Sequence, residues 1–414
     1  MKPSKVELRQ INNQFQLRVN NQPFYIKGAG VDFGNIKNLA DFGGNAFRTW
    51  RVTNGEKTGR EILDEAHQNG LMVCMGLEVE RERHGFDYDD KQAVAEQMAE
   101  IKKDILALKD HPALLMWGIG NELNLRHKNP KVWDAVNDLS KMIHDLDPNH
   151  PTTTMLAGAE PEVIELVDEL CPDLDLLSFQ IYGEIDKLPS YLQQSNYQGA
   201  YMITEWGATG HWECSNTDWD RPIEANSSEK AKDYYSRYLN YIVADAKQCI
   251  GSFVFLWGQK QERTPTWYGL FLENGKSTEA AQVMQYLWTG KWTKHRIPQL
   301  DSLEIDGMFA EESVRLQKGQ TYSAKIDIDS THQNLSYRWE LMKEVERELE
   351  SDGGDFEPAP EIVWQQSGSN TSMEVEFSPP QTGEFRLFVY VDDYYGGSAT
   401  ANMPILIESS PISS

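Results

Sequence analysis

Between residues 23 and 290, short apolar runs alternate with amphipathic stretches, which is the pattern of a parallel sheet covered by helices. The apolar runs predict strands at 24–31, 45–51, 71–79, 113–120, 151–156, 175–182, 201–206 and 252–257. The amphipathic stretches predict helices at 35–42, 59–69, 91–109, 131–146, 161–170, 187–195, 228–248 and 278–288. Eight strand–helix units within about 270 residues match the size of a (β/α)8, or TIM, barrel. The predicted fold class is therefore α/β.

After Trp292 the helical stripes give way to period-two alternation, with short strands and turn signals. Over about 100 residues this pattern predicts a small all-β, immunoglobulin-like sandwich. We expect a barrel domain at 1–292 that begins with a strand pair within 6–20, a linker at 293–300, and the sandwich at 301–414. The acidic insertion from Glu344 to Glu361 is expected to be a long mobile loop.

The charge balance narrows the classes of partner. The net charge is −25, from 39 basic and 64 acidic residues. Nucleic acid and anionic membrane surfaces both need a positive field, so neither is an expected partner. A neutral substrate is the simpler interpretation, although a local arginine cluster could bind an acidic one and solubility alone could explain the charge.

Several other features are expected to be absent. No stretch approaches the ~20 apolar residues that span a bilayer, so membrane insertion is not expected. The N-terminus has no apolar signal core, which predicts a cytoplasmic protein unless a signal peptide was removed from a secreted or periplasmic one. Cysteines, histidines and carboxylates show no metal-ligand spacing, and no glycine-rich loop follows a strand, so no metal and no cofactor are expected. Cys74 is expected to be a buried free thiol.

Candidate chemistry lies where two apolar runs end in a carboxylate. These runs are Leu114-Leu-Met-Trp-Gly-Ile-Gly-Asn-Glu122 and Tyr201-Met-Ile-Thr-Glu-Trp-Gly207. Packing explains an apolar run but not a glutamate at its carboxyl end, and a (β/α)8 barrel builds its active site from that edge of the strands. Two carboxylates facing one pocket suggest an acid/base and a nucleophile for cleavage of a glycosidic bond.

The expected barrel, roughly residues 20–290, resembles glycoside hydrolase clan A, and within it families 2 and 5. The resemblance is carried by the opening Asn20-Asn-Gln-Pro-Phe-Tyr-Ile-Lys-Gly-Ala-Gly30, by Asn121-Glu122 after the fourth strand, and by Glu205 at the end of the seventh. It implies that Glu122 is the acid/base, that Glu205 is the nucleophile and that Asn121 binds the sugar 2-hydroxyl.

The same resemblance extends to further residues at the ends of strands. Arg48, in Asn45-Ala-Phe-Arg-Thr-Trp-Arg51, is similar to the clan arginine that pairs with the nucleophile, with Arg51 as the competing choice. Tyr182 resembles a tyrosine that donates to the nucleophile, and Trp257 resembles the platform under the cleaved sugar. Trp206 and His211, close behind Glu205, are further substrate-binding candidates.

Each assignment has a structural alternative. A glutamate after a strand can be a helix cap, Arg48 can be a structural salt-bridge residue, and Tyr182 and Trp257 can be barrel packing. His211 can equally belong to surface-loop packing. After the third strand, Glu78, Glu80 and Glu82 alternate with Arg81 and Arg83, a stretch expected to be mostly solvated.

The resemblance implies a retaining β-glycosidase that acts on a carbohydrate substrate, with a neutral β-glucan, for example a β-1,3-linked one, as the expected substrate. A transglycosylase would use the same residues and differ only in how an acceptor sugar competes with water. A carbohydrate-binding protein that keeps the barrel without catalysis is a third hypothesis, which the intact Asn121, Glu122 and Glu205 disfavour. The oligomeric state is left open.

Overall fold

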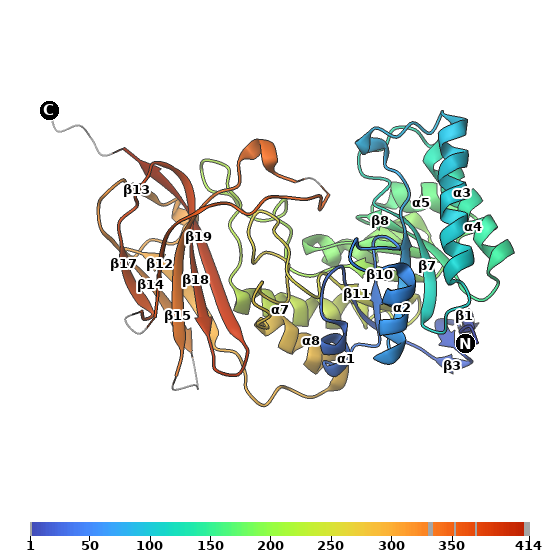
Figure 1. Ribbon diagram of the computed structural model, residues 1–414, viewed down its shortest axis with the longest axis horizontal. Coiled ribbons are helices and arrows are strands. Elements are labelled where there is room, and N and C mark those ends of the chain that lie inside the picture. Colours follow the sequence, from blue (N-terminus) through green and yellow to red (C-terminus); the bar gives the residue numbers. More distant parts are fainter. Residues whose placement is uncertain (1, 330–333, 352, 369–370, 410–414) are drawn as a thin grey trace. The chain divides into compact units, whose positions relative to one another are not determined.

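In a computed structural model, the predicted parallel strands close into a barrel (Figure 1). The structure describes residues 2–329, 334–351, 353–368 and 371–409. Within them the barrel strands are β4 (Ile26–Gly30), β5 (Ala46–Arg48), β6 (Met72–Leu77), β7 (Leu114–Asn121), β8 (Thr152–Ala157), β9 (Leu177–Gln180), β10 (Tyr201–Glu205) and β11 (Cys249–Val254). Neighbours pair in parallel in chain order, and β11 returns to β4. The predicted barrel is confirmed.

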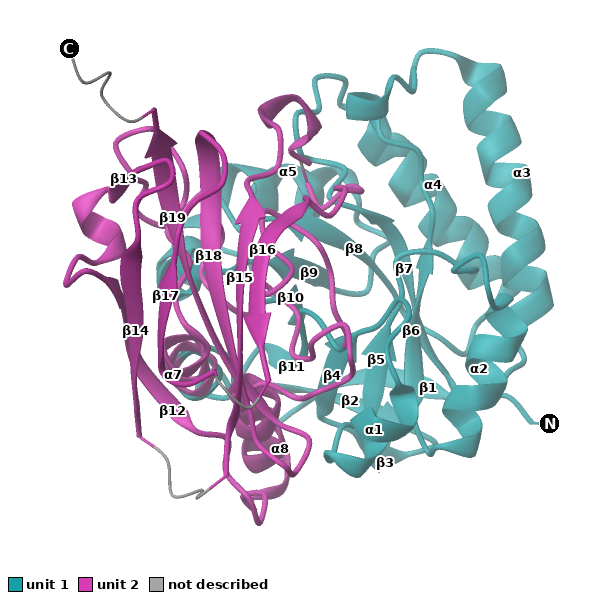
Figure 2. Cartoon of the chain, turned by 60° about the vertical axis from the view of Figure 1, so that its left-hand side comes forward, with its two compact units in different colours: residues 1–206, 237–257 teal, residues 207–236, 258–414 magenta. Residues whose placement is uncertain are grey.

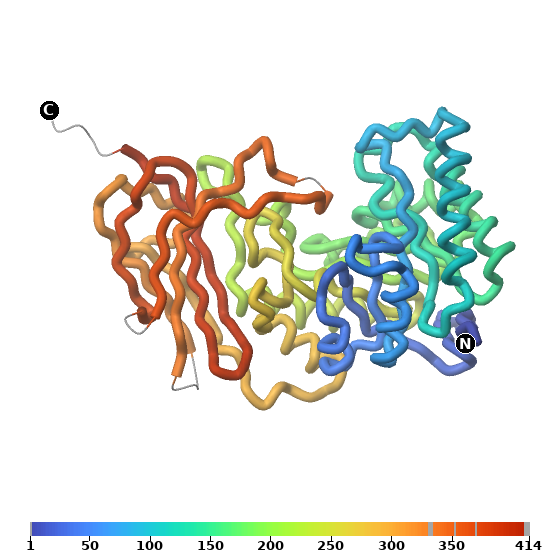
Figure 3. The backbone as a smooth tube through the Cα atoms, in the orientation of Figure 1, coloured from blue at the N-terminus to red at the C-terminus, as the bar shows by residue number. Residues whose placement is uncertain are grey.

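Helices follow the strands as the amphipathic stretches predict. They are α1 (Ile36–Asp41), α2 (Gly59–Gln68), α3 (Lys91–Leu108), α4 (Lys131–Leu146), α5 (Pro161–Leu170), α6 (Leu188–Ser195), α7 (Ser227–Arg237) and α8 (Glu279–Thr289). Local signals fix their starts: Thr58 and Glu61 form a capping box on α2, and the Asp90 side chain accepts two backbone amides at the start of α3. The trace shows α3 and α4 side by side on the outside of the barrel (Figure 3).

Two predicted boundaries are wrong. The helix expected to run to residue 248 ends as a π-helical turn at Tyr238–Ile242, because the Asp245 side chain instead accepts the amides of Lys247 and Gln248 at 3.0 and 3.1 Å. The last barrel strand, expected at 252–257, occupies Cys249–Val254. Trp257 therefore lies three residues beyond the strand that it was expected to close.

Two compact units divide the chain, and each is described by itself (Figure 2). Unit 1 comprises Met1–Trp206 and Arg237–Trp257 and contains all eight strands of the barrel, β4 to β11. Unit 2 comprises Gly207–Ser236 and Gly258–Ser414. The residues that follow β10 and β11 thus group with the C-terminal β-sheets. The division expected at residues 293–300 lies inside unit 2, and independent folding of 1–292 and 301–414 stays a prediction.

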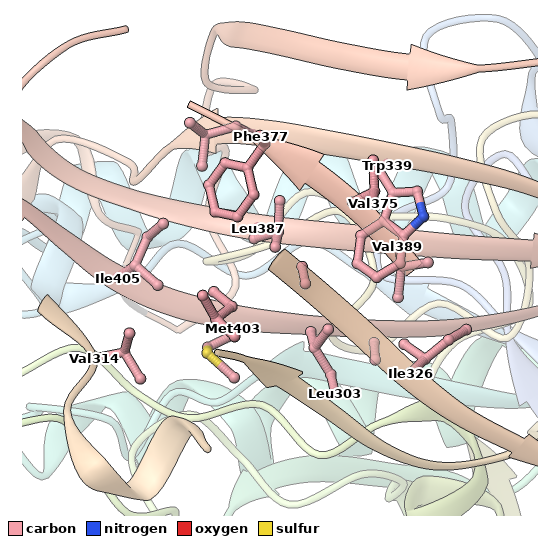
Figure 4. Close-up of a cluster of buried hydrophobic side chains, with 14 of the residues drawn as sticks. Leu303, Val314, Ile326, Trp339, Val375, Phe377, Leu387, Val389, Met403 and Ile405 are labelled. Carbon is pink, nitrogen blue, oxygen red and sulfur yellow. The ribbon is translucent and has the colours of Figure 1, made fainter. Parts of the chain in front are cut away.

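Unit 2 contains the predicted β-sandwich. One sheet consists of β12 (Gln299–Ile305), β14 (Tyr322–Asp329) and β17 (Glu374–Phe377), and the other of β13 (Arg315–Gln317), β19 (Ser398–Glu408), β18 (Gly383–Asp392), β15 (Ser336–Lys343) and β16 (Ile362–Ser367). Inward-facing side chains of both sheets form the core, among them Trp339, Leu387 and Val389 opposite Ile326 and Val375 (Figure 4). The period-two pattern is the sequence signature of this packing.

The acidic segment from Glu344 to Glu361, expected to be a long mobile loop, contains two buried carboxylates. Within unit 2, the buried carboxylates of Glu344 and Glu357 pair with Arg386 and Arg263 at 2.9 and 2.7 Å. These arginines lie elsewhere in the chain, so they could not be matched to the acidic residues by composition.

The barrel floor is covered by the N-terminal strands. β1 (Val6–Ile11), β2 (Gln14–Val19) and β3 (Gln22–Pro23) form an antiparallel sheet, which confirms the strand pair expected within 6–20. Val6 and Leu17 are buried in one cluster with apolar residues at the starts of the barrel strands, such as Ile26 and Ala46.

A buried polar chain ties this segment to the barrel. The Ser4 hydroxyl donates to the carbonyl of Leu114 at 2.7 Å and contacts His150 Nε2 at 2.9 Å. His150 Nδ1 lies 2.7 Å from the Asp147 carboxylate, which also accepts the Trp117 indole N–H at 2.8 Å. Burial alone would raise the pKa of Asp147, but the hydrogen bonds from His150 and Trp117 outweigh it, so this pKa lies below its ordinary value.

We predict that Asp147→Asn lowers the free energy of unfolding by about 3 kcal/mol at pH 7, because it removes a buried anion that contacts both the His150 ring and the Trp117 indole. Since the pKa of Asp147 is lower in the folded than in the unfolded chain, its stabilisation is complete above the unfolded value of about 3.9 and is lost as the pH falls through the folded value. Urea denaturation should therefore show a gap between variant and wild type that narrows toward pH 3.

Asp64→Asn is the matched control, because the Asp64 carboxylate lies 3.0 Å from His111 Nε2 but is 40% exposed. This change should lower the free energy of unfolding by no more than about 1 kcal/mol. Equal losses for the two variants, or a loss for Asp147→Asn that does not depend on pH, would contradict the account.

Candidate active site

Glu205, the last residue of β10, has a buried carboxylate that accepts hydrogen bonds from three side chains. Arg48 Nη1 and Trp50 Nε1 donate to its Oε1 at 3.1 and 2.9 Å. The Tyr182 hydroxyl donates to its Oε2 at 2.7 Å. Donors on both oxygens, one of them cationic, stabilise the carboxylate anion and fix its orientation.

Arg48 connects Glu205 to Asn121. It ends β5, its side chain is 1% exposed, and its Nη2 donates to Asn121 Oδ1 at 2.8 Å. Burial lowers the pKa of the Arg48 guanidinium, and the negative charge of Glu205 opposes this effect. Arginine remains charged under these conditions, so Arg48 balances the buried carboxylate.

Asn121 ends β7, and its side-chain oxygen is held by two donors. Besides Arg48, Gln180 Nε2 at the end of β9 donates to Asn121 Oδ1 at 2.7 Å. With this oxygen occupied, the amide nitrogen is the side-chain atom of Asn121 that can donate to a sugar hydroxyl. The two contacts thus fix the orientation of Asn121, and its binding to a sugar 2-hydroxyl stays a prediction.

Glu122 follows β7 directly and is half-buried. Its backbone is left-handed, with φ of 53°, and its amide donates to the carbonyl of Met155 on β8 at 2.8 Å. Gly120 prepares this turn with φ of 73°, where a Cβ atom would lie 2.5 Å from the Leu123 side chain. The Gly-Asn-Glu run is therefore a tight exit from the strand at the carboxyl edge of the barrel.

The structure brings Arg48, Tyr182 and Glu205 into direct contact and links Asn121 through Arg48. The competing arginine, Arg51, instead pairs with Asp32 at 3.1 Å.

The two tryptophan candidates are packed into unit 1. The Trp206 ring is buried with its centroid 5.7 Å from that of Tyr238. Trp257 is 1% exposed, and its ring contacts Phe42 edge-on with centroids 5.3 Å apart. A substrate-binding role for either ring stays a prediction.

His211 belongs to unit 2, in the segment that follows Glu205 in sequence. Its Nε2 lies 3.4 Å from the Glu262 carboxylate, and its ring meets Trp212 and Trp267 edge-on. Burial would raise the pKa of Glu262, but the contacts with His211 and Lys260 outweigh it and lower this pKa. A contact between His211 and substrate stays a prediction.

Two contacts of the site were not predicted from the sequence. Trp50 lies two residues after Arg48, and Gln180 lies two residues before Tyr182. In extended chain, residues two apart face the same side, so this spacing was an available signal. Phe255 supports both aromatic donors, with edge-on ring contacts to Trp50 at 5.8 Å and to Tyr182 at 6.0 Å.

Among the residues that the structure describes, no group of three or more histidine, cysteine, aspartate or glutamate side chains is placed to hold a metal ion. The absence of a metal and of a cofactor stays a prediction. Cys74 is a buried free thiol, as predicted, and burial raises its pKa to about 12. None of the described helices is both long and apolar enough to cross a membrane.

The closed parallel barrel agrees with the comparisons with known proteins. The family "Glycosyl hydrolases family 2, TIM barrel domain" matches residues 36–259. Because the match covers more than half of the 414 residues, the chain belongs to glycosyl hydrolase family 2. A curated β-glucuronidase from Streptococcus agalactiae is 26% identical in an alignment of 197 residues, and the match covers 40% of this chain and 32% of that protein.

Two solved structures show the same fold. Bacteroides uniformis β-glucuronidase 2, covalently bound to cyclophellitol-6-carboxylate aziridine, is 15% identical with a TM-score of 0.53, covering 98% of this chain and 48% of that one. The β-D-glucuronidase for Dictyoglomus thermophilum is 18% identical with a TM-score of 0.53, covering 70% and 54%. The chain thus spans a third to about half of the length of these relatives.

We predict that Arg48→Met lowers the free energy of unfolding by about 3–5 kcal/mol, because it leaves the buried Glu205 charge without its cation. The double variant Arg48→Met with Glu205→Gln should lose less than Arg48→Met alone, since no unpaired charge remains. Urea denaturation of the variants at neutral pH measures both quantities.

Arg51→Met removes an arginine from the neighbouring, more exposed pair with Asp32 and should lower the free energy of unfolding by no more than about 1 kcal/mol. Two results would show that Arg48 does not balance the charge of Glu205. One is a loss of unfolding free energy for Arg48→Met as small as that for Arg51→Met. The other is a double variant that is less stable than Arg48→Met alone.

Proposed function

We propose that the chain is a retaining β-glycoside hydrolase in which Glu205 is the nucleophile and Glu122 is the acid/base. The observation that carries the proposal is the buried Glu205 carboxylate with three donors, Arg48, Trp50 and Tyr182. These donors bind both oxygens of the carboxylate and fix its orientation, as a nucleophile that attacks an anomeric carbon requires.

The reaction proceeds by double displacement. Glu205 attacks the anomeric carbon while Glu122 gives its proton to the leaving oxygen, so a covalent glycosyl-enzyme forms and the aglycone departs. Glu122, now a carboxylate, takes a proton from water as that water attacks the anomeric carbon and releases Glu205. The Asn121 amide, oriented by Arg48 and Gln180, donates to the sugar 2-hydroxyl during both steps.

For the substrate we propose a neutral β-linked glucan, for example a β-1,3-linked one. Arg51 and Lys57, which follow β5, already pair with Asp32 and Glu65 at 3.1 and 2.5 Å. Together with the net charge of −25, these pairs favour a neutral sugar over an anionic one.

A β-glucuronide is the second candidate substrate. It is favoured by the β-glucuronidase from Streptococcus agalactiae and by the carboxylate-bearing compound bound to the Bacteroides uniformis enzyme. Transglycosylation by the same residues, and carbohydrate binding without catalysis, remain the alternatives for the reaction itself.

A panel of 4-nitrophenyl β-glycosides and polysaccharides separates the two substrates. We expect kcat/KM for a neutral β-glucoside or β-glucan to exceed that for the β-glucuronide by about tenfold or more, because a buried polar site rejects a charged group that it cannot pair. A preference for the glucuronide would overturn the neutral substrate while leaving the reaction class intact. A sugar-transfer product in place of released sugar would identify the transglycosylase.

We predict that Glu205→Ala lowers turnover by several orders of magnitude, about 10⁴-fold or more, because it removes the covalent step. Sodium azide should restore part of the activity on a 2,4-dinitrophenyl β-glycoside and give a glycosyl azide of inverted configuration, since the small anion attacks in place of the carboxylate. Nuclear magnetic resonance of the product reads its configuration.

Glu65→Ala is the control. It also removes a paired glutamate of unit 1, but the Glu65–Lys57 pair is more exposed than the Glu205–Arg48 pair. It should retain wild-type turnover. A Glu205→Ala protein that is folded by circular dichroism and has wild-type turnover would end the proposal.

A further inference from the structure

The loop after β6 contacts the loop that carries Glu122 through three consecutive residues, Arg81, Glu82 and Arg83. Arg81 Nε donates to the main-chain carbonyl of Asn121 at 3.1 Å. Arg83 Nη1 donates to the main-chain carbonyl of Glu122 at 3.0 Å. The two carbonyls flank the backbone of the proposed acid/base on both sides.

Glu82 makes the opposite contact between the same loops. Its Oε2 accepts the amide of Lys128 at 2.6 Å and the amide of Asn129 at 3.1 Å. These two amides, with the nearby His127 and Lys128 charges, hold the pKa of Glu82 below its ordinary value. The charges thus alternate with their partners: the two arginines donate to main-chain carbonyls of the opposite loop, and the glutamate between them accepts from its main-chain amides.

The donating loop is itself anchored. Glu78 and Glu80 are exposed, as expected of this stretch, whereas Arg81, Glu82 and Arg83 are half-buried. The Tyr88 hydroxyl donates to the carbonyl of Glu80, and the Glu80 amide donates to Gln97 on α3 at 2.7 Å. The arginines therefore extend from a fixed loop and can hold the neighbouring one in place.

The backbone of Glu122 is left-handed, with φ of 53°. This conformation is unfavourable by about 1–2 kcal/mol for a residue with a Cβ atom and persists only where surrounding contacts enforce it. The Glu122 amide is held by Met155 on β8, and its carbonyl by Leu125 and Arg83. Without Arg83, the Glu122 carbonyl loses its hydrogen bond to the loop after β6.

We propose that Arg81 and Arg83 are positioning residues that hold Glu122 at the angle required for proton transfer to the leaving group. The inference rests on the proposed function, in which Glu122 is the acid/base. It predicts that the two arginines affect the step that needs a proton donor and spare the attack by Glu205.

The test compares kcat/KM on phenyl and 2,4-dinitrophenyl β-glycosides of the sugar that the panel selects. The phenyl leaving group needs protonation, whereas the dinitrophenyl group departs with little help. Arg83→Met should lower kcat/KM by about 10- to 100-fold on the phenyl glycoside, since small misplacements of a catalytic group have effects of this size. On the dinitrophenyl glycoside the loss should stay within about threefold, and Arg83→Lys, which keeps one donor, should recover part of the phenyl activity.

Arg60→Met is the matched control. Arg60 Nη2 on α2 also donates to a main-chain carbonyl, that of Ala107 in α3, at 2.8 Å, but it lies far in sequence from the Glu122 turn. This variant should leave both rates unchanged. Melting temperatures of all variants show whether a lost rate reflects unfolding.

Glu122→Gln calibrates the experiment, because it should lose far more activity on the phenyl than on the dinitrophenyl glycoside. If it does and Arg83→Met loses both activities equally, or neither, the positioning role is overturned while the proposed function stands. If Glu122→Gln itself shows no such selectivity, the proposed function fails and the inference fails with it. Selective loss in both variants supports the two together.

Discussion

The site depends on one buried charge pair, the Glu205 carboxylate and the Arg48 guanidinium at 3.1 Å. Each of these side chains is at most 8% exposed, so each charge is compensated by the other rather than by water. Closing the barrel brings them together from β10 and β5, which are not adjacent strands. The pair therefore requires the complete barrel and in turn limits how its strands can be arranged.

Hydrogen bonds extend this constraint to the groups that handle the sugar. The second nitrogen of Arg48 fixes Asn121, and the Tyr182 hydroxyl fixes the other oxygen of Glu205. Glu205 is thus oriented by side chains at or near strand ends, a rigid arrangement that suits a nucleophile. Glu122 lies one residue beyond its strand in a left-handed turn, so its position depends more strongly on contacts between loops.

The barrel and the sandwich could be predicted because each follows from local periodicity, and the Arg48–Glu205 contact could be predicted because the sequence around Arg48 resembles that of glycoside hydrolase clan A. Trp50 and Gln180 were not predicted, although each lies two residues from a predicted site residue, because spacing alone does not show which polar atoms meet once distant strands have paired. The sequence also did not predict that the segments after β10 and β11 group with the C-terminal β-sheets in unit 2. There Glu224, which follows β10, accepts hydrogen bonds from Lys230 and from Asn402 on β19 at 2.5 and 2.7 Å, a pairing that no sequence spacing reveals.

Trapping of the covalent intermediate tests the central claim, that Glu205 is the nucleophile of a retaining glycosidase. A 2,4-dinitrophenyl 2-deoxy-2-fluoro-β-glycoside of the preferred sugar slows both steps through its fluorine and keeps a good leaving group, so the glycosyl-enzyme should accumulate. Peptide mass spectrometry should then find one fluorosugar attached to the peptide that contains Glu205, and none in Glu205→Ala. A label on another carboxylate, or full turnover of the natural substrate without any trapped sugar, would contradict the account.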